Sequence, residues 1–266
     1  MTHENFDTIR QAVRERYGQI AQAGTAGCGC APTSCCDTSD TTTPEVTALG
    51  LGYSSDDVST VPAGANMGLG CGNPKALAAL QPGEVVLDLG SGGGFDCFLA
   101  ARAVGEQGQV IGVDMTPDMV SKARANAVKA GLGNVEFRLG EIEHLPVANQ
   151  SVEVIISNCV INLSPDKAQV FRDAFRVLKP GGRLAIADIV ATAPLPESVR
   201  QDLALYTGCV AGAALIDDLE QMVAAAGFTA IRIQPRDESR TFIREWAPGR
   251  KIEDVVLSAT IEAMKL

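Results

Sequence analysis

The sequence is short of basic residues. Lys and Arg total 22 against 32 Asp and Glu in 266 residues, which gives a formal net charge of −10. A protein that neutralises phosphates on nucleic acid, or that lies on an anionic membrane surface, needs a basic face. We therefore expect no nucleic-acid partner and no membrane partner.

Long apolar runs are also missing. The longest low-charge run, between Asp202 and Asp217, contains Gly208 and Gly212 and is too short to cross a bilayer. The first ten residues, MTHENFDTIR, are polar and lack the apolar core of a secretion signal. We expect a cytoplasmic protein, and the hydrophobic content of 46% suits a full globular core.

Cysteine, in contrast, is plentiful, with eight residues. A chain of this length without an export signal does not fit a disulfide scaffold, which leaves buried fillers, metal ligands or catalytic thiols. A helix with an apolar stripe is predicted over residues 6–20. A flexible arm rich in Gly, Ser, Thr and Asp follows, and it carries four of the cysteines: Cys28, Cys30, Cys35 and Cys36.

Strand and helix patterns alternate through the middle of the chain. Strands are predicted at 84–89, 109–114, 134–139, 152–157 and 182–190, with helices at 117–131 and 166–178 among them. Ser164-Pro165 is expected to begin the second of these helices. Two late strands, 229–234 and 254–264, complete a doubly wound α/β sheet that is mostly parallel with a late antiparallel strand.

A glycine-rich turn follows the first predicted strand, in the segment Asp88-Leu-Gly-Ser-Gly-Gly-Gly94. Glycines allow a tight turn and a close approach to a ligand, and Asp114 after the next strand suits the two hydroxyls of a ribose. A dinucleotide site would have Gly or Ala where this chain has Phe95, and Asp88 would repel a pyrophosphate but could receive an amino group. Both departures favour S-adenosylmethionine over NAD.

The glycine-rich turn, G-V-D-M at 112–115 and L-K-P-G-G at 178–182 together resemble the class I methyltransferase family over roughly residues 75–235. The resemblance implies that Met115 packs on the adenine and that Gly140, Glu141 and Ile142 border its edge; Met115 is equally explained as a core residue. The expected cofactor residues therefore also include Asp88, Gly90, Ser91, Gly92, Gly94, Asp114 and Asn158.

Three further cysteines lie in segments that can meet above the carboxyl ends of the strands. Cys71 is in a glycine-rich stretch before the first strand, Cys159 follows the fourth, and Cys209 follows the fifth. Soft thiolates select soft metal or metalloid centres. Each of them could instead fill the core, and for Cys97, in the helix after the glycine-rich turn, that is the interpretation we prefer.

The phrases G-L-G-C-G-N-P, S-N-C-V-I-N-L-S-P-D-K and G-C-V-A-G-A resemble the arsenite methyltransferase family from about Tyr53 to the C-terminus. The resemblance implies that Cys71, Cys159 and Cys209 bind trivalent arsenic, and that an arm cysteine accepts substrate or forms a disulfide during turnover. It also implies arsenite or its thiol conjugate as substrate, with glutathione or thioredoxin as reductant. Some members have an acid before the third cysteine, where this chain has Gly208.

Alternatives and boundaries remain open at this point. Asn158 either lines the methyl-transfer site or caps local structure. The rival functions are a small-molecule C- or O-methyltransferase with incidental cysteines and a non-catalytic soft-metal thiol site, for which the arm offers C-x-C and C-C. We expect a helix and arm over 1–44, a cofactor-binding domain over 45–192, and an arsenic-binding cap with the closing strands over 193–266.

Overall fold

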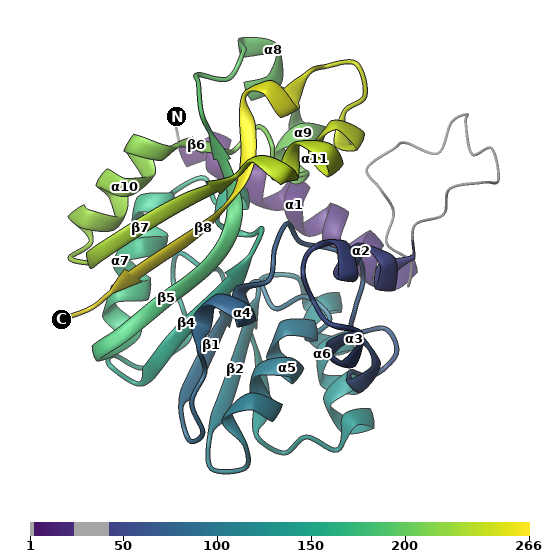
Figure 1. Cartoon of the computed structure of the whole chain (residues 1–266), viewed down its shortest axis with the longest axis vertical. Coiled ribbons are helices and arrows are strands. Elements are labelled where there is room, and N and C mark those ends of the chain that lie inside the picture. Colours follow the sequence, from purple (N-terminus) through teal and green to yellow (C-terminus); the bar gives the residue numbers. More distant parts are fainter. Residues whose placement is uncertain (1–2, 24–42) are drawn as a thin grey trace.

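A computed structural model describes residues 3–23 and 43–266 (Figure 1). Its centre is one twisted sheet with the strand order β3-β2-β1-β4-β5-β8-β7, and β6 pairs with β5 off this path. The strands are β1 (Val85–Leu89), β2 (Gln109–Asp114), β3 (Val135–Leu139), β4 (Val152–Asn158), β5 (Leu178–Ala191), β6 (Ala214–Leu215), β7 (Thr229–Arg236) and β8 (Val256–Met264).

Helices cover both faces of the sheet (Figure 1). They are α1 (His3–Ala23), α2 (Pro44–Gly50), α3 (Ser55–Thr60), α4 (Pro74–Ala78), α5 (Phe95–Val104), α6 (Pro117–Ala130), α7 (Lys167–Val177), α8 (Glu197–Arg200), α9 (Leu203–Thr207), α10 (Ile216–Ala225) and α11 (Arg240–Trp246). Short 3-10 turns are η1 (Ile161–Leu163), η2 (Asp237–Ser239) and η3 (Ile252–Asp254).

The continuous apolar strands are explained by burial on both faces. Val86 of β1 packs into the layer of α4, α5 and α6, whereas its neighbour Leu87 packs into the layer of α7 and α10. Successive side chains of a strand point to opposite faces, so a strand covered on both sides is apolar throughout. The doubly wound fold predicted from the alternation is therefore confirmed.

The late antiparallel strand is confirmed as well. β8 pairs antiparallel with β5 along its whole length, from Arg183 opposite Met264 to Ala191 opposite Val256, and β7 pairs antiparallel with β8. The expected boundary after residue 192 falls just beyond β5, and strands on both sides of it belong to the same sheet.

Two local expectations need correction. The strand expected at 182–190 begins at Leu178, because Leu178 already pairs with Val152 of β4, and the register shifts before the next pair, Val154 with Arg183. The helix expected to begin at Pro165 begins at Lys167, because the Asp166 side chain accepts the backbone N–H of Gln169 at 3.0 Å and caps it. The short helices α2, α3, α4 and α11 were not predicted.

The strand order reverses between β1 and β4, whose carboxyl ends lie next to each other. Ligands of open α/β sheets bind in the crevice outside such a switch point. Helix α1 packs beside α6, α9 and η1 at this end of the sheet. The fold therefore places the glycine-rich turn after β1 and the Cys159 segment after β4 on either side of one crevice, closed in part by α1.

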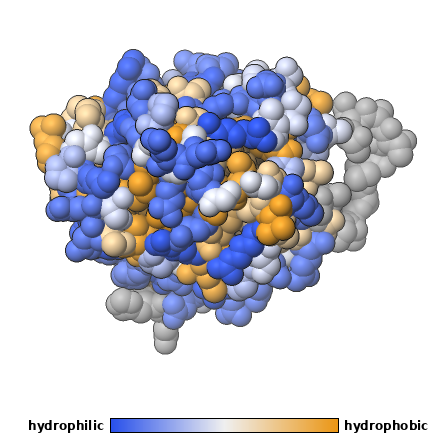
Figure 2. All heavy atoms as spheres, turned by 90° about the horizontal axis from the view of Figure 1, so that it is seen from below, coloured by the Kyte–Doolittle hydropathy of each residue, from blue (hydrophilic) through white to orange (hydrophobic). Residues whose placement is uncertain are grey.

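Figure 2 shows polar side chains over most of one face, with apolar residues in patches between them. Among the helices in the described ranges, none combines the length and the apolar character that a bilayer crossing requires.

Candidate active site

A cavity of about 630 Å³ opens at the switch point. The glycine-rich turn, the end of β2, the segment after β4 and the segment after α9 all contribute to its wall. Helix α1 adds Arg10, Val13, Tyr17 and others, and α11 adds Phe242 and Trp246. One cavity therefore contains both the expected cofactor segments and two of the expected thiols.

The glycine-rich turn is held against β2 by its backbone. Gly90 and Ser91 both donate to the carbonyl oxygen of Val113, at 2.8 and 3.0 Å. Gly90 has φ of 71°, and a Cβ there would lie 2.3 Å from a methyl carbon of Val160. Only glycine allows this turn to pass so close to the segment after β4, which brings the two sides of the crevice together.

Asp114 is oriented by two backbone N–H groups. Its Oδ2 accepts from Gly92 at 3.0 Å and its Oδ1 from Thr116 at 2.8 Å. A carboxylate offers about four acceptor positions, so after these two bonds and the interaction with the Thr116 side chain, acceptor capacity remains for a ribose hydroxyl. Burial raises the pKa of the Asp114 carboxyl, and the two backbone bonds oppose that shift.

Two buried polar groups in the cavity wall suit a ligand. Ser91 Oγ has no hydrogen-bond partner within the described part of the chain, although it is buried. Asp88 is 3% exposed, and burial raises its pKa well above the usual range. A cationic amino group would favour the ionised carboxylate and would lower that pKa.

The remaining expected cofactor residues divide into two groups. Met115, Ile142 and Asn158 line the cavity. Gly94, Gly140 and Glu141 are absent from its lining: Gly94 caps α5, Gly140 donates to the carbonyl of Asp114 at 3.0 Å, and Glu141 forms ion pairs with Arg10 and Arg14 of α1. Glu141 thus contacts α1 at a neighbouring surface.

Three cysteines from remote segments meet beside this cavity. Cys71, Cys159 and Cys209 are 1%, 8% and 3% exposed. The Cys209 thiol donates to the carbonyl oxygen of Cys159 at 2.8 Å, and the Cys159 thiol interacts with the thiols of both other cysteines. Cys159 is therefore the central member of the three.

The backbone is strained at two of these three cysteines. Cys159 has φ of 59° and Cys209 has φ of 65°, a left-handed conformation that costs non-glycine residues about 1–3 kcal/mol. Such strain persists only where the surroundings enforce it, and it concentrates at functional sites.

Two thiols of the three-cysteine cluster, those of Cys71 and Cys159, are protonated at neutral pH when no ligand is bound. The neighbouring thiols of Cys209 and Cys71, followed by burial, raise the pKa of Cys159 well above its usual value. Burial is the main cause of the raised pKa of Cys71. These thiols therefore carry their protons to any exchange reaction with a substrate.

Asn158 connects the segment after β4 to the glycine-rich stretch. Its Oδ1 accepts the N–H of Cys71 at 3.0 Å, and its Nδ2 donates to the carbonyl of Gly72 at 2.9 Å and to Tyr53 Oη at 3.0 Å. The carbonyl of Cys71 in turn accepts from Ser258 Oγ at 2.7 Å. Asn158 lines the cavity and also fixes the backbone that carries Cys71.

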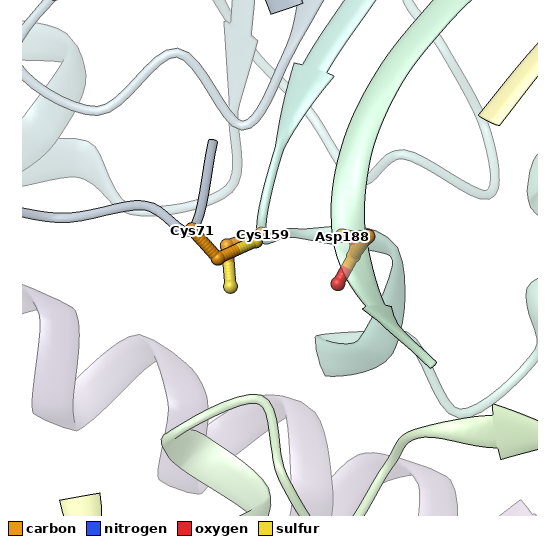
Figure 3. A group of neighbouring side chains, drawn as sticks. All are labelled: Cys71, Cys159 and Asp188. Atoms are coloured by element: carbon orange, nitrogen blue, oxygen red, sulfur yellow. The ribbon is translucent and has the colours of Figure 1, made fainter. Parts of the chain in front are cut away.

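Asp188, a buried acid on β5, was not among the residues predicted from the sequence. Its carboxylate and the thiols of Cys71 and Cys159 offer ligand atoms that all lie within 4.8 Å of one another (Figure 3). Burial raises the pKa of Asp188 to about 6. The signal was an acid inside the apolar run L-A-I-A-D-I-V, a position that burial of both strand faces would otherwise make apolar.

Cys97 lies elsewhere, in the layer of α5, fully buried and with its thiol 3.2 Å from Asp88 Oδ2. This agrees with its expected role as a core residue. Cys28, Cys30, Cys35 and Cys36 lie outside the described residues.

Known proteins resemble this chain both in the cofactor-binding part and over nearly its whole length. A family described as a methyltransferase domain matches residues 80–227. The chain is 57% identical to an arsenite methyltransferase of Halobacterium salinarum, over 97% of this chain and 67% of that protein. The chain belongs to the arsenite methyltransferase family. Together with the methyltransferase domain, this makes the chain an S-adenosylmethionine-dependent methyltransferase, and the NAD alternative is set aside.

Two further relatives of the chain support its assignment to this family. An arsenite methyltransferase of Aquipseudomonas alcaligenes is 43% identical over 74% of this chain and 58% of its own length. The solved arsenic(III) S-adenosylmethionine methyltransferase of Chlamydomonas reinhardtii superposes with a TM-score of 0.63 at 32% identity, covering 85% of this chain and 75% of that one. The chain thus spans about two thirds or less of the two curated relatives.

Proposed function

We propose that the chain transfers a methyl group from S-adenosylmethionine to trivalent arsenic. The first acceptor is arsenite, held by Cys71, Cys159 and Cys209, and the second is methylarsenite, held by two of these thiols. The observation that carries the proposal is the meeting of three buried thiols beside a cavity that also contains Asp114 and the glycine-rich turn.

Different residues of the cavity suit the different chemical groups of the cofactor. When bound, S-adenosylmethionine supplies an electrophilic methyl group on a sulfonium sulfur. The free acceptor positions of Asp114 suit the ribose hydroxyls, Asp88 suits the amino group, and Ser91 Oγ supplies a buried hydrogen-bonding group. Met115 and Ile142 offer apolar surface for the adenine.

Arsenic binding is an exchange of oxygen ligands for sulfur ligands. Each As–O bond of arsenous acid breaks as an As–S bond forms, and the thiol proton leaves with the hydroxide as water. Three thiolates leave the arsenic lone pair unshared, and this pair forms the bond to the methyl carbon. No proton leaves the nucleophile at that step, so catalysis depends on orientation and exclusion of water, which can supply roughly 7–11 kcal/mol.

Arsenite binding should be almost independent of pH near neutrality. Because the raised pKa values of Cys71 and Cys159 keep these thiols protonated, each of the two brings a proton that combines with a hydroxide of arsenous acid, with no net release. The Kd, measured by isothermal titration in several buffers, should change by less than about threefold between roughly pH 6.5 and 8. A rise in affinity of about tenfold per pH unit would contradict this exchange, since it would require a released proton.

Turnover needs two electrons. After transfer, arsenic is formally pentavalent, and oxidation of two thiols to a disulfide returns it to the trivalent state. An arm cysteine, Cys28, Cys30, Cys35 or Cys36, together with a site cysteine would provide this pair, and glutathione or thioredoxin would reduce the disulfide by thiol exchange. The arm would therefore serve the reaction cycle as well as substrate delivery.

Formation of S-adenosylhomocysteine tests the function directly. The full chain with S-adenosylmethionine should form it only when both arsenite and a thiol reductant are present, at a rate at least about 100-fold above the arsenite-free background. Tight arsenite binding without S-adenosylhomocysteine would indicate a sequestering site. Turnover of an organic acceptor without arsenite would indicate the C- or O-methyltransferase alternative.

A further inference from the structure

We propose that Cys71, Cys159 and Asp188 form a binding site for a soft divalent cation, Cd²⁺ or Zn²⁺, which overlaps the proposed arsenic site but uses a different third ligand. The cation site rests on the positions of these side chains. Only its competition with arsenite rests on the proposed function.

The geometry suits a tetrahedral ion. Sulfur ligands of Zn²⁺ lie about 2.3 Å from the metal, which places them about 3.8 Å apart. The two thiol sulfurs and a carboxylate oxygen already lie within 4.8 Å of one another, so a shift of about 1 Å would bring them into ligand positions. Figure 3 shows the two thiols next to each other, with the Asp188 carboxylate directed into the same space.

The Asp188 carboxylate is oriented by hydrogen bonds and can still bind a metal ion. Its Oδ1 accepts from Asn162 Nδ2 at 2.9 Å and from its neighbour Ile189 at 2.7 Å, and its Oδ2 accepts the N–H of Ile161 at 2.8 Å. Oδ1 thus accepts two of these bonds and Oδ2 one, while the backbone N–H of Asn162 also interacts with the carboxylate, so Oδ2 is the oxygen with more capacity left for a ligand. Metal-binding carboxylates are typically oriented by hydrogen bonds of this kind.

A divalent ion balances most of the charge that its ligands carry once the two thiols have lost their protons. Two thiolates and one carboxylate carry −3, so a divalent cation leaves −1 at the site. The partly exposed Lys167 interacts electrostatically with Asp188 and offsets part of that charge. Binding releases two thiol protons, and a water can occupy the fourth position without adding charge.

Arsenic and the cation differ in what they need from the third ligand. Trivalent arsenic takes three thiolates in a pyramid and leaves its lone pair free, whereas Cd²⁺ and Zn²⁺ accept oxygen in a fourfold shell. Cys209 should therefore matter to arsenic, and Asp188 to the cation. A bound cation would withhold Cys71 and Cys159 from arsenite.

The test uses the full chain, reduced, with serine at Cys28, Cys30, Cys35 and Cys36 so that the arm cannot bind metal. Cd²⁺ is titrated and followed by the thiolate-to-cadmium absorption band, and arsenite binding is measured separately. Asp188→Asn should weaken Cd²⁺ binding at least about 10-fold and change arsenite binding by less than about threefold. Cys209→Ser should do the reverse, and Cys97→Ser should change neither.

An equal loss of Cd²⁺ affinity in Cys71→Ser and Cys209→Ser, with none in Asp188→Asn, would overturn the proposal. Because Asp188→Asn can disturb the η1 segment, X-ray absorption of the Cd²⁺-loaded parent chain gives an independent readout. Two sulfur ligands with at least one oxygen support the site, and a shell of sulfur alone overturns it. Cd²⁺ binding in a chain that neither binds nor methylates arsenite would sink the proposed function while leaving the cation site standing.

Discussion

Replacing Cys159 by serine should abolish methyl transfer to both arsenite and methylarsenite. We expect kcat/KM to fall at least about 1000-fold on each substrate, equivalent to about 4 kcal/mol of transition-state stabilisation. Initial rates of S-adenosylhomocysteine formation would measure the loss.

The position of Cys159 explains why both substrates should be affected. Its thiol interacts with those of Cys71 and Cys209, so each neighbouring pair of sulfurs includes it. Arsenite offers three exchangeable hydroxides, but methylarsenite offers two and needs only a pair of thiols. Without Cys159, neither pair remains close enough to hold arsenic with its lone pair directed at the methyl group.

Cys97→Ser is the matched control, because Cys97 is also a buried free cysteine but lies in α5 and outside the three-cysteine cluster. It should retain most of the activity, since serine can still donate to Asp88. The Cys159 variant should also bind S-adenosylmethionine with unchanged affinity. Retained methylation of either substrate by Cys159→Ser would count decisively against the arsenic site.

Asp114→Ala should raise the Kd for S-adenosylmethionine roughly 100-fold or more. The carboxylate keeps acceptor capacity beyond its two backbone bonds, and hydrogen bonds to a charged group are worth about 1.5–3 kcal/mol each. Loss of both ribose bonds would therefore remove about 3 kcal/mol or more. Isothermal titration of the cofactor measures the effect.

Asp118→Ala offers the control, since Asp118 is an exposed acid in the first turn of α6, only four positions away. Its cofactor affinity should stay within about twofold of the parent. Arsenite binding should be unchanged in both variants, because Asp114 belongs to the other side of the crevice. If Asp114→Ala bound the cofactor normally, the ribose assignment would be wrong.

Part of the site could be predicted from the sequence because its residues lie next to the ends of predicted strands. The glycine-rich turn, Asp88 and Asp114 all stand next to predicted strand ends, where local pattern and backbone conformation carry the information. The same holds for the sheet itself, because strands buried on both faces are apolar throughout. The short helices α2, α3, α4 and α11 gave no such signal, because five to seven residues are too few for a period to emerge.

The chain's own order of residues determined the doubly wound fold, the place of the cofactor turn and the presence of thiols near the strand ends. Only the tertiary structure decided which of these groups touch. The fold after α9 brings the Cys209 thiol onto the carbonyl oxygen of Cys159, and the pairing of β5 with β4 places the buried Asp188 next to Cys71 and Cys159. Such contacts join residues tens of positions apart, and no local periodicity records them, because they follow from how separate elements pack and not from the preference of any single segment.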